Sequence, residues 1–349
     1  MRAVLPGRPR HLVWLQTGFL GDQIITTAAF GAAAECLPGV RQHLITSPVG
    51  AAALAGQPHL QSVTVFRKRG GSFRRSAGEV RLRLQEAGVY DEPAVLLRPH
   101  RSTRSGLLAL TLGLPAITYR QSHLRLRSVA VERVAVMHEE NRIALLLEPL
   151  GIPREKIMAV RQCLSPLPPS DAPWNRGLDE AKTLVALAPG SVWGTKRWPV
   201  EGWQELAARL LKNEDITLVL LGSKEEQKAS DEIAAFCDAG SRLVNLAGRT
   251  SLDDLRRIYP RLHLLVSNDS SPIHYASAFN IPTVALFGAT VPAMGFGPRA
   301  AGSTVLGVDM DCRPCSDHGP MTCPLTHFRC MRELSAERVY SACVERLGT

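Results

Sequence analysis

The sequence lacks the long apolar segments that membrane-spanning and secreted proteins carry. The best candidate for a spanning helix, residues 106–117, contains Pro115 and falls short of the roughly 18 apolar residues that a bilayer requires. Near the N-terminus, prolines and arginines between positions 6 and 10 interrupt any apolar core of a signal peptide. We therefore expect a protein that stays in the cytoplasm.

Aromatic residues are scarce at 5% of the chain, and no nucleic-acid-binding motif is present. Few side chains are thus available to stack on bases, and we expect no nucleic-acid partner. Neither GxGxxG nor GxxxxGK[ST] occurs, which argues against a dinucleotide-dependent dehydrogenase and against a P-loop nucleotidase.

The eight cysteines are scattered along a long chain, so a disulfide framework is not expected.

The chain has 349 residues, and at roughly 150 residues per domain this length predicts two domains. Lysine and arginine exceed aspartate and glutamate by 41 to 32, a net charge of +9. Such an excess favours anionic partners, whether phosphates or an anionic membrane surface.

Buried strands and helices alternate along the chain. The segment HLVWLQT, residues 11–17, is typical of a buried strand, and a short glycine-containing turn joins it to a small-residue helix at 23–36. Similar alternation follows, and it starts again at residue 183 after a proline-rich stretch. This pattern predicts two doubly wound α/β domains with parallel sheets, whose carboxyl edges face an interdomain cleft that holds the ligands.

The expected boundaries follow from this pattern. We predict an N-terminal Rossmann-like domain over residues 1–165, a linker over 166–182 and a second Rossmann-like domain over 183–330. A final helix over 331–349 can pack on either domain.

The most informative segment is NDSSPIHYASAFNIPTVALFG, residues 268–288. A buried strand ends at Asp269, and a helix follows with Ser271 as its expected N-cap and proline at its first position. The free amides and positive dipole end of such a helix suit a phosphate, which Ser270 and His274 can also contact. The alternative is an ordinary capped helix with a surface histidine.

Two further residues lie at strand-to-helix turns. Lys196 belongs to the loop APGSVWGTKRWP, where it can neutralise a pyrophosphate; the alternative is a solvated basic loop with packed tryptophans. Asp22 ends the GFLGD turn, where a carboxylate serves equally well as a general base or as a helix cap.

Together, GFLGD, APGSVWGTKRWP and NDSSPIHYASAFNIPTVALFGAT resemble the heptosyltransferase family of bacterial glycosyltransferases. The resemblance implies a two-domain GT-B fold and inverting transfer of heptose from ADP-heptose to a lipopolysaccharide inner-core acceptor, with no metal required for catalysis. It also implies Asp22 as the base and assigns the donor to Lys196, Glu226, Asp269, Ser270, Ser271 and His274. Ser271 departs from the family's usual glycine.

The acceptor side is expected in the first domain. Residues 67–83 hold seven lysines or arginines and one acid, and Arg98, His100, Arg101 and Arg104 follow a predicted strand. In the resembled family the corresponding segment lies near the acceptor. A phosphorylated glycolipid at the inner face of the inner membrane fits this charge, and a solvated basic face is the alternative.

A cysteine-rich loop spans residues 312–330, with Cys312 and Cys315 as a CxxC pair followed by Cys323 and Cys330. Four thiols at this spacing are compatible with a structural zinc or iron site, and the alternative is a cluster of reduced or partly paired thiols. Either way the loop is expected to be structural.

Three other functions stay open at this stage. The same fold and donor site can glycosylate a protein such as an autotransporter, a two-domain fold of this kind also serves sugar-nucleotide epimerases, and a noncatalytic binding protein can retain it. No oligomeric state follows from the sequence.

Overall fold

The computed structural model describes residues 4–67, 72–237 and 239–348. The chain divides into two compact units, Met1–Ser165 and Pro166–Thr349, so the first unit ends where the first domain was expected to end. Each unit is described by itself below.

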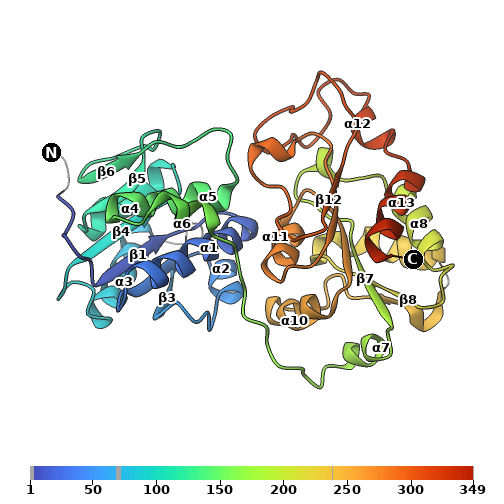
Figure 1. Cartoon of the computed structure of the whole chain (residues 1–349), viewed down its shortest axis with the longest axis horizontal. Coiled ribbons are helices and arrows are strands. Elements are labelled where there is room, and N and C mark those ends of the chain that lie inside the picture. Colours follow the sequence, from blue (N-terminus) through green and yellow to red (C-terminus); the bar gives the residue numbers. More distant parts are fainter. Residues whose placement is uncertain (1–3, 68–71, 238, 349) are drawn as a thin grey trace. The chain divides into compact units, whose positions relative to one another are not determined.

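Unit 1 is built on a parallel sheet with the strand order β3-β2-β1-β4-β5-β6 in the part of the chain that is described (Figure 1). Its strands are β1 (His11–Leu15), β2 (Arg41–Thr46), β3 (Ser62–Val65), β4 (Ala94–Arg98), β5 (Ala116–Tyr119) and β6 (Ser128–Val131). Its helices are α1 (Leu20–Cys36), α2 (Pro48–Ala53), α3 (Phe73–Glu86), α4 (Thr103–Leu112), α5 (Glu139–Ala144), the 3-10 helix η1 (Leu145–Leu150) and α6 (Arg154–Ala159).

Helices on both faces explain why the central strands of unit 1, β1 and β4, are buried along their whole length. All five residues of β1 are buried. Trp14 faces α1, where its ring lies 5.4 Å from that of Phe30, whereas Val13 belongs to the core that includes Val80 of α3 and Leu108 of α4. Because successive side chains of a strand point to opposite faces, a strand covered on both sides shows no polar alternation.

Unit 2 repeats the topology, with the order β12-β11-β10-β7-β8-β9 and parallel pairing throughout its described residues. Its strands are β7 (Thr183–Ala188), β8 (Ile216–Leu220), β9 (Leu243–Asn245), β10 (Leu264–Asn268), β11 (Thr283–Leu286) and β12 (Thr304–Leu306). Its α-helices are α7 (Arg176–Asp179), α8 (Val200–Leu210), α9 (Gln227–Cys237), α10 (Leu252–Ile258), α11 (Ser271–Ala278), α12 (Arg329–Arg332) and α13 (Ala336–Leu347). Short 3-10 helices are η2 (Pro173–Asn175), η3 (Gly194–Lys196), η4 (Lys224–Glu226), η5 (Gly240–Arg242), η6 (Tyr259–Arg261) and η7 (Pro292–Met294).

The end of the chain packs within unit 2, where Val339 and Cys343 of α13 share a core with Trp203 of α8. The expectation of one continuous final helix was wrong. The chain leaves α12 after Arg332 and restarts at Ser335, whose hydroxyl accepts a hydrogen bond from the Arg338 amide at 3.3 Å and caps α13.

The predicted pair of doubly wound α/β domains is confirmed. In both sheets the first strand lies beside the fourth, β1 beside β4 and β7 beside β10, and this is where the strand order reverses. Ligands of such sheets bind at the carboxyl ends of the strands at this point, which makes the loops after these four strands the places to examine. Among the helices of the described ranges, none has the length and apolarity needed to cross a membrane.

Candidate functional site

The carboxyl edge of the unit 2 sheet brings together a cation, an acid and a hydroxyl. The Lys196 ammonium lies 2.6 Å from Asp269 Oδ2, and the Thr290 hydroxyl donates to the same oxygen at 2.5 Å. The side chains of Lys196 and Asp269 are only 12% and 6% exposed. Lys196, in the loop after β7, and Asp269, directly after β10, are thus in direct contact.

Asn268, the last residue of β10, holds the loop that carries Lys196. Its amide nitrogen donates to the Pro189 carbonyl at 2.7 Å, and its carbonyl oxygen accepts from the Trp198 amide at 3.1 Å. The side chain is fully buried and ties the two ends of the loop together. Asn268 and Thr290 were not predicted as site residues from the sequence. For Asn268, a polar residue at the end of an apolar strand could have indicated such a role.

Gly190 joins two other expected donor residues. Its carbonyl accepts a hydrogen bond from the Ser270 hydroxyl at 3.3 Å. A Cβ at this position would lie 2.0 Å from the carboxyl carbon of Glu226, so any other residue here would displace that carboxylate. Glu226 also accepts from the Ser223 amide at 2.7 Å. Ser270 and Glu226 therefore both lie against the backbone of Gly190.

Helix α11 begins one residue earlier than the sequence suggested. Its N-cap is Ser270 rather than Ser271, so Ser271 is the first helical residue and proline follows it. The backbone of Ser270 is extended, and its side chain makes no capping hydrogen bond. Its hydroxyl is instead directed to Gly190, which connects the helix start to the Lys196 loop.

His274 lies in the interior rather than on the surface, with 5% of the residue exposed. Burial lowers the pKa of its imidazole to about 3, and the positive charge of Lys196 adds to this effect. The ring is therefore neutral at physiological pH. Its expected contact with a donor phosphate stays a prediction.

In unit 1, Asp22 occupies the third position of α1 and caps the helix. Its Oδ2 accepts a hydrogen bond from the Phe19 amide at 3.0 Å, and a Cβ at Gly18 would lie 2.4 Å from the same oxygen. The glycine of the turn thus makes room for the carboxylate. Of the two roles expected for Asp22, the structure confirms the cap, and the general base stays a prediction.

The four expected acceptor residues lie in different environments. Arg98 is 1% exposed, and its guanidinium donates to loop carbonyls, including that of His123 at 2.7 Å. Burial lowers its pKa to about 10. His100 is partly buried, whereas Arg101, before the N-cap of α4, and Arg104, in its first turn, are exposed. Arg98 therefore holds the loop, and Arg101 and Arg104 are open to solvent.

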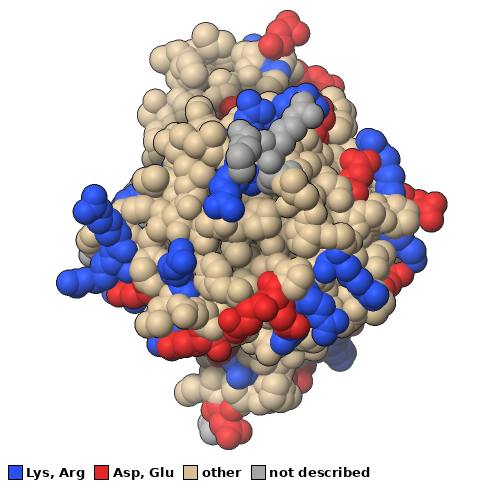
Figure 2. All heavy atoms as spheres, turned by 90° about the vertical axis from the view of Figure 1, so that its left-hand side faces the viewer, with Lys and Arg blue, Asp and Glu red and all other residues tan. Residues whose placement is uncertain are grey.

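The basic stretch over residues 67–83 does not form an uninterrupted positive surface. Arg83 pairs with Glu86 at 2.9 Å, and both residues line a cavity of about 680 Å³ together with Arg67 and Glu79. Residues 68–71 of this stretch lie outside the described residues. On the face shown in Figure 2, lysines and arginines form separate groups with acidic side chains between them.

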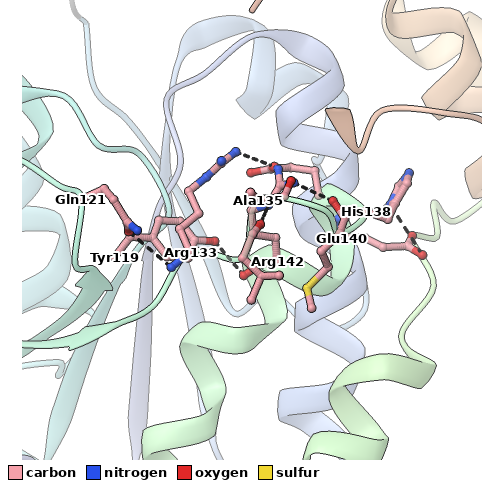
Figure 3. Close-up of polar contacts among 10 residues, drawn as sticks. Tyr119, Gln121, Arg133, Ala135, His138, Glu140 and Arg142 are labelled. Carbon is pink, nitrogen blue, oxygen red and sulfur yellow. Dashed lines mark hydrogen bonds and ion pairs between the residues drawn. The ribbon is translucent and has the colours of Figure 1, made fainter. Parts of the chain in front are cut away.

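A buried network that the sequence analysis did not anticipate fixes the segment after β6 (Figure 3). The Arg142 guanidinium donates to the carbonyls of Val134, Ala135 and Met137 at 2.6–2.9 Å. The carbonyl of Arg142 in turn accepts the Tyr119 hydroxyl at 2.7 Å. One arginine of α5 thus holds a loop at the carboxyl edge of the sheet.

The four expected metal ligands are free thiols: Cys312, Cys315 and Cys323 are partly buried, and Cys330 is buried. Burial raises the pKa of Cys330, and the three other cysteines influence it electrostatically, which places the thiols near one another. Within the described residues, no three His, Cys, Asp or Glu side chains are grouped so that they could hold a metal ion. A structural zinc or iron site at these cysteines stays a prediction, and we assign no chemical step to a metal here.

Comparison with known proteins gives a consistent picture. The model of glycosyltransferase family 9 (heptosyltransferase) matches residues 102–325, more than half of the chain. Lipooligosaccharide heptosyltransferase 2 of Campylobacter jejuni subsp. jejuni serotype O:6 is 27% identical over 173 residues, which cover 49% of this chain and 54% of that protein. Lipopolysaccharide heptosyltransferase 2 of Escherichia coli K12 is 36% identical over 118 residues, or 33% and 34% of the two chains. The chain thus spans about half, or less, of the length of these relatives.

The comparison with solved structures covers nearly the whole chain. The structure of the E. coli ADP-heptose lps heptosyltransferase II superposes with a TM-score of 0.74 at 20% identity, covering 97% of this chain and 98% of that one. The expected GT-B class of two Rossmann-like units is thereby confirmed. On the evidence of the family match, this chain belongs to glycosyltransferase family 9, the heptosyltransferase family.

Proposed function

We propose that this protein is an inverting glycosyltransferase that moves heptose from ADP-heptose to an inner-core lipopolysaccharide acceptor. The observation that carries the proposal is the contact of Lys196 with Asp269 at the switch point of the unit 2 sheet, beside the start of α11. The family of the chain and the names of its relatives support heptose as the sugar and lipopolysaccharide as the product.

The donor diphosphate is assigned to unit 2. Lys196 supplies a positive charge, and the first amides of α11 supply partial positive charge that stabilises the departing ADP. Asp269 orients the lysine, and the Thr290 hydroxyl holds Asp269. Because these groups neutralise the charge of the leaving group, the proposal assigns no metal to catalysis. Glu226, adjacent to Gly190, is assigned to the ribose or base of the nucleotide.

Asp22 is proposed as the general base. It removes the proton of the acceptor hydroxyl as that oxygen forms a bond to the anomeric carbon and the bond to the ADP oxygen breaks. Attack from the side opposite the leaving group inverts the configuration. The hydrogen bond from the Phe19 amide fixes one carboxylate oxygen and so orients the other.

The acceptor is assigned to unit 1, where His100, Arg101 and Arg104 follow β4. Cationic side chains beside a loop held by Arg98 suit the phosphates of an anionic glycolipid. The proposal places the enzyme in the cytoplasm, at the inner face of the inner membrane, because this is where basic surface residues meet anionic lipid.

A transfer assay tests this proposal. Purified protein is incubated with ADP-heptose and a heptose-deficient lipopolysaccharide, and ADP release and acceptor mass are both followed. We expect a mass increase of one heptose and an equal amount of ADP. Transfer only from UDP-sugars, or to a protein acceptor alone, would contradict the donor or the acceptor assignment respectively. Conversion of the donor without transfer would indicate an epimerase.

A further inference from the structure

The cysteine-rich loop, residues 312–330, is hydrogen-bonded through Pro320 to the loop that carries Lys196. The Pro320 carbonyl accepts two hydrogen bonds from Thr195, one from its amide at 3.2 Å and one from its hydroxyl at 2.6 Å. Thr195 is 3% exposed and directly precedes Lys196. Any displacement of Pro320 therefore acts on the residue next to the lysine.

The two loops also fit closely in shape. A Cβ at Gly194 would lie 2.2 Å from the Met321 carbonyl oxygen, so this position admits only glycine. At Gly319 the backbone has a φ of +77°, and a Cβ there would lie 3.4 Å from Lys196 Cγ. The ring of Trp193 stacks on that of His318, with centroids 5.9 Å apart and planes 7° from parallel.

A second connection runs to the acid of the pair. The Arg313 guanidinium donates to the carbonyls of Phe287 and Thr290 at 2.8 and 2.9 Å, and the Cys315 amide donates to the Ala289 carbonyl at 2.8 Å. Thr290 is the residue whose hydroxyl donates to Asp269. The same loop thus contacts the segment that carries Lys196 and the segment whose Thr290 holds Asp269.

We propose that the cysteine-rich loop positions the donor-binding pair, with Thr195 and Arg313 as its positioning residues. Thr195 transmits the contact from Pro320 to Lys196, and Arg313 transmits the contact from the loop to Asp269 through Thr290. This inference rests on the proposed function in one respect, that Lys196 binds the donor diphosphate. It gives the loop a role in donor affinity, beyond a purely structural one.

Pre-positioning is the physical basis of this role. Lysine has a long, flexible side chain, and restraining it before the donor arrives reduces the entropy lost on binding. The Lys196 side chain is held 2.6 Å from Asp269 Oδ2, with 12% of it exposed. Removal of the Thr195 hydroxyl should therefore weaken ADP binding without removing any group that touches ADP.

A double-mutant cycle on ADP binding tests the proposal. Thr195→Val removes the hydroxyl and keeps the shape, and we expect the Kd for ADP to rise about fivefold, the effect of one net hydrogen bond. In a Lys196→Ala background the same substitution should change the Kd by less than about 1.5-fold, because residues that act through one another are not additive. Thr195→Ser should restore binding. Thr322→Val, an exposed threonine of the same loop, is the matched control and should have no effect.

A kinetic split adds a second readout. Thr195→Val and Arg313→Lys should raise the KM for the donor and leave the KM for the acceptor unchanged. Equal effects of Thr195→Val with and without Lys196 would overturn the proposal, and so would a normal Kd in the Thr195→Val protein.

A measurement without any nucleotide separates this proposal from the proposed function. Reductive methylation of the native protein, followed by peptide mass spectrometry, gives the reactivity of the Lys196 amine relative to Lys228, whose side chain is 91% exposed. We expect Thr195→Val to raise the relative rate at Lys196 at least threefold, and Thr322→Val to leave it unchanged. An unchanged rate at Lys196 overturns the positioning role even if ADP binds. A raised rate in a protein that binds no ADP would instead reject only the donor assignment.

Discussion

The two units share a strand order and differ in what they place at the matching edge. The fourth strand of each sheet ends in a buried polar residue, Arg98 in unit 1 and Asn268 in unit 2. The Arg98 guanidinium is buried in unit 1 and donates hydrogen bonds to loop carbonyls. Asn268 holds its loop with a neutral amide, so the cation of unit 2, Lys196, is available to pair with Asp269 at the edge of the site. The same topology therefore carries a cation that holds a loop in unit 1 and, in unit 2, a cation that pairs with an acid and is proposed to bind the donor.

The acids at the two edges also have different proposed roles, because Asp22 of unit 1 is the general base and Asp269 of unit 2 orients Lys196; the largest expected effect tests the role of Asp22. Asp22→Asn retains a helix-capping side chain but cannot accept the proton of the acceptor. We expect the transfer rate to fall about 100- to 10,000-fold, the range for loss of a general base, with ADP affinity and unfolding temperature unchanged. Glu35→Gln near the end of the same helix, whose carboxylate contacts Lys156, should keep full activity. Full activity of Asp22→Asn would remove Asp22 from the mechanism.

Replacement of the structural cation should cost stability instead of binding. Arg98→Met leaves several buried carbonyls without a donor, and we expect the free energy of unfolding in urea to fall by about 3 kcal/mol. The matched variant Arg104→Met, on the exposed side of α4, should change it by less than about 0.5 kcal/mol. If the two variants are equally stable, the interior role of Arg98 is wrong.

A buried histidine pair in unit 1 predicts a pH dependence. His43 Nε2 lies 2.8 Å from His11 Nδ1, and both side chains are fully buried. Burial lowers the pKa of His43 to about 4, with the charges of His11 and Arg41 adding to the effect. The unfolded chain, with a pKa near 6.5, binds a proton first as the pH falls.

Stability should accordingly decrease as the pH falls from about 6.5 to about 4, by at most about 3 kcal/mol from His43, and level off below. Urea unfolding at pH 7.5, 6, 5 and 4.5 measures this slope, which should be flatter for His43→Gln. If the unfolding free energy depends on pH with the same slope in both proteins, protonation of His43 does not destabilise the fold.

Asn268→Ala tests whether the uncharged Asn268 side chain holds the loop that carries Lys196. The variant leaves the Pro189 carbonyl and the Trp198 amide without their partner, and we expect a loss of about 2 kcal/mol in unfolding free energy. In contrast to Arg98→Met, it should also weaken ADP binding, because the loop that it releases carries Lys196. Asn245→Ala, at the end of the partly exposed strand β9, is the control and should not change ADP affinity.

The smallest effect is expected for Ser270→Ala. Its hydroxyl donates to Gly190 at 3.3 Å, a long hydrogen bond, and we expect the Kd for ADP to rise about two- to fivefold. Calorimetric titration measures this change. An unchanged Kd would exclude a contact between the Ser270 hydroxyl and the donor.

Much of this arrangement could be predicted from the sequence because local patterns carry it. Continuous apolar runs such as that of β1 indicate strands covered on both faces, and a glycine turn before a helix places Asp22 at the sheet edge. Strands β5, β6, β9 and β12 have only three or four residues, and runs of this length are too short to show a period in the sequence.

The details of the site depend on contacts between distant residues, which no local pattern reveals. Thr290 reaches Asp269 across 21 positions, and Pro320 reaches Thr195 across 125. Arg98 was expected at the acceptor because it belongs to a basic segment after a predicted strand, yet its guanidinium lies in the interior and donates to carbonyls. A single C-terminal helix was expected, but Ser335 in the middle of the segment is a good N-cap and starts a separate helix.

The central claim is that the cation of unit 2 binds the donor diphosphate, and calorimetric titration with ADP, UDP and GDP tests it most directly. Wild-type protein should bind ADP with a stoichiometry of one and prefer it to UDP and GDP. Lys196→Ala should raise the Kd for ADP at least about tenfold, the cost of one charge-assisted contact, with the unfolding temperature little changed. Equal ADP affinity in the two proteins, or preference for another nucleotide, would contradict the account.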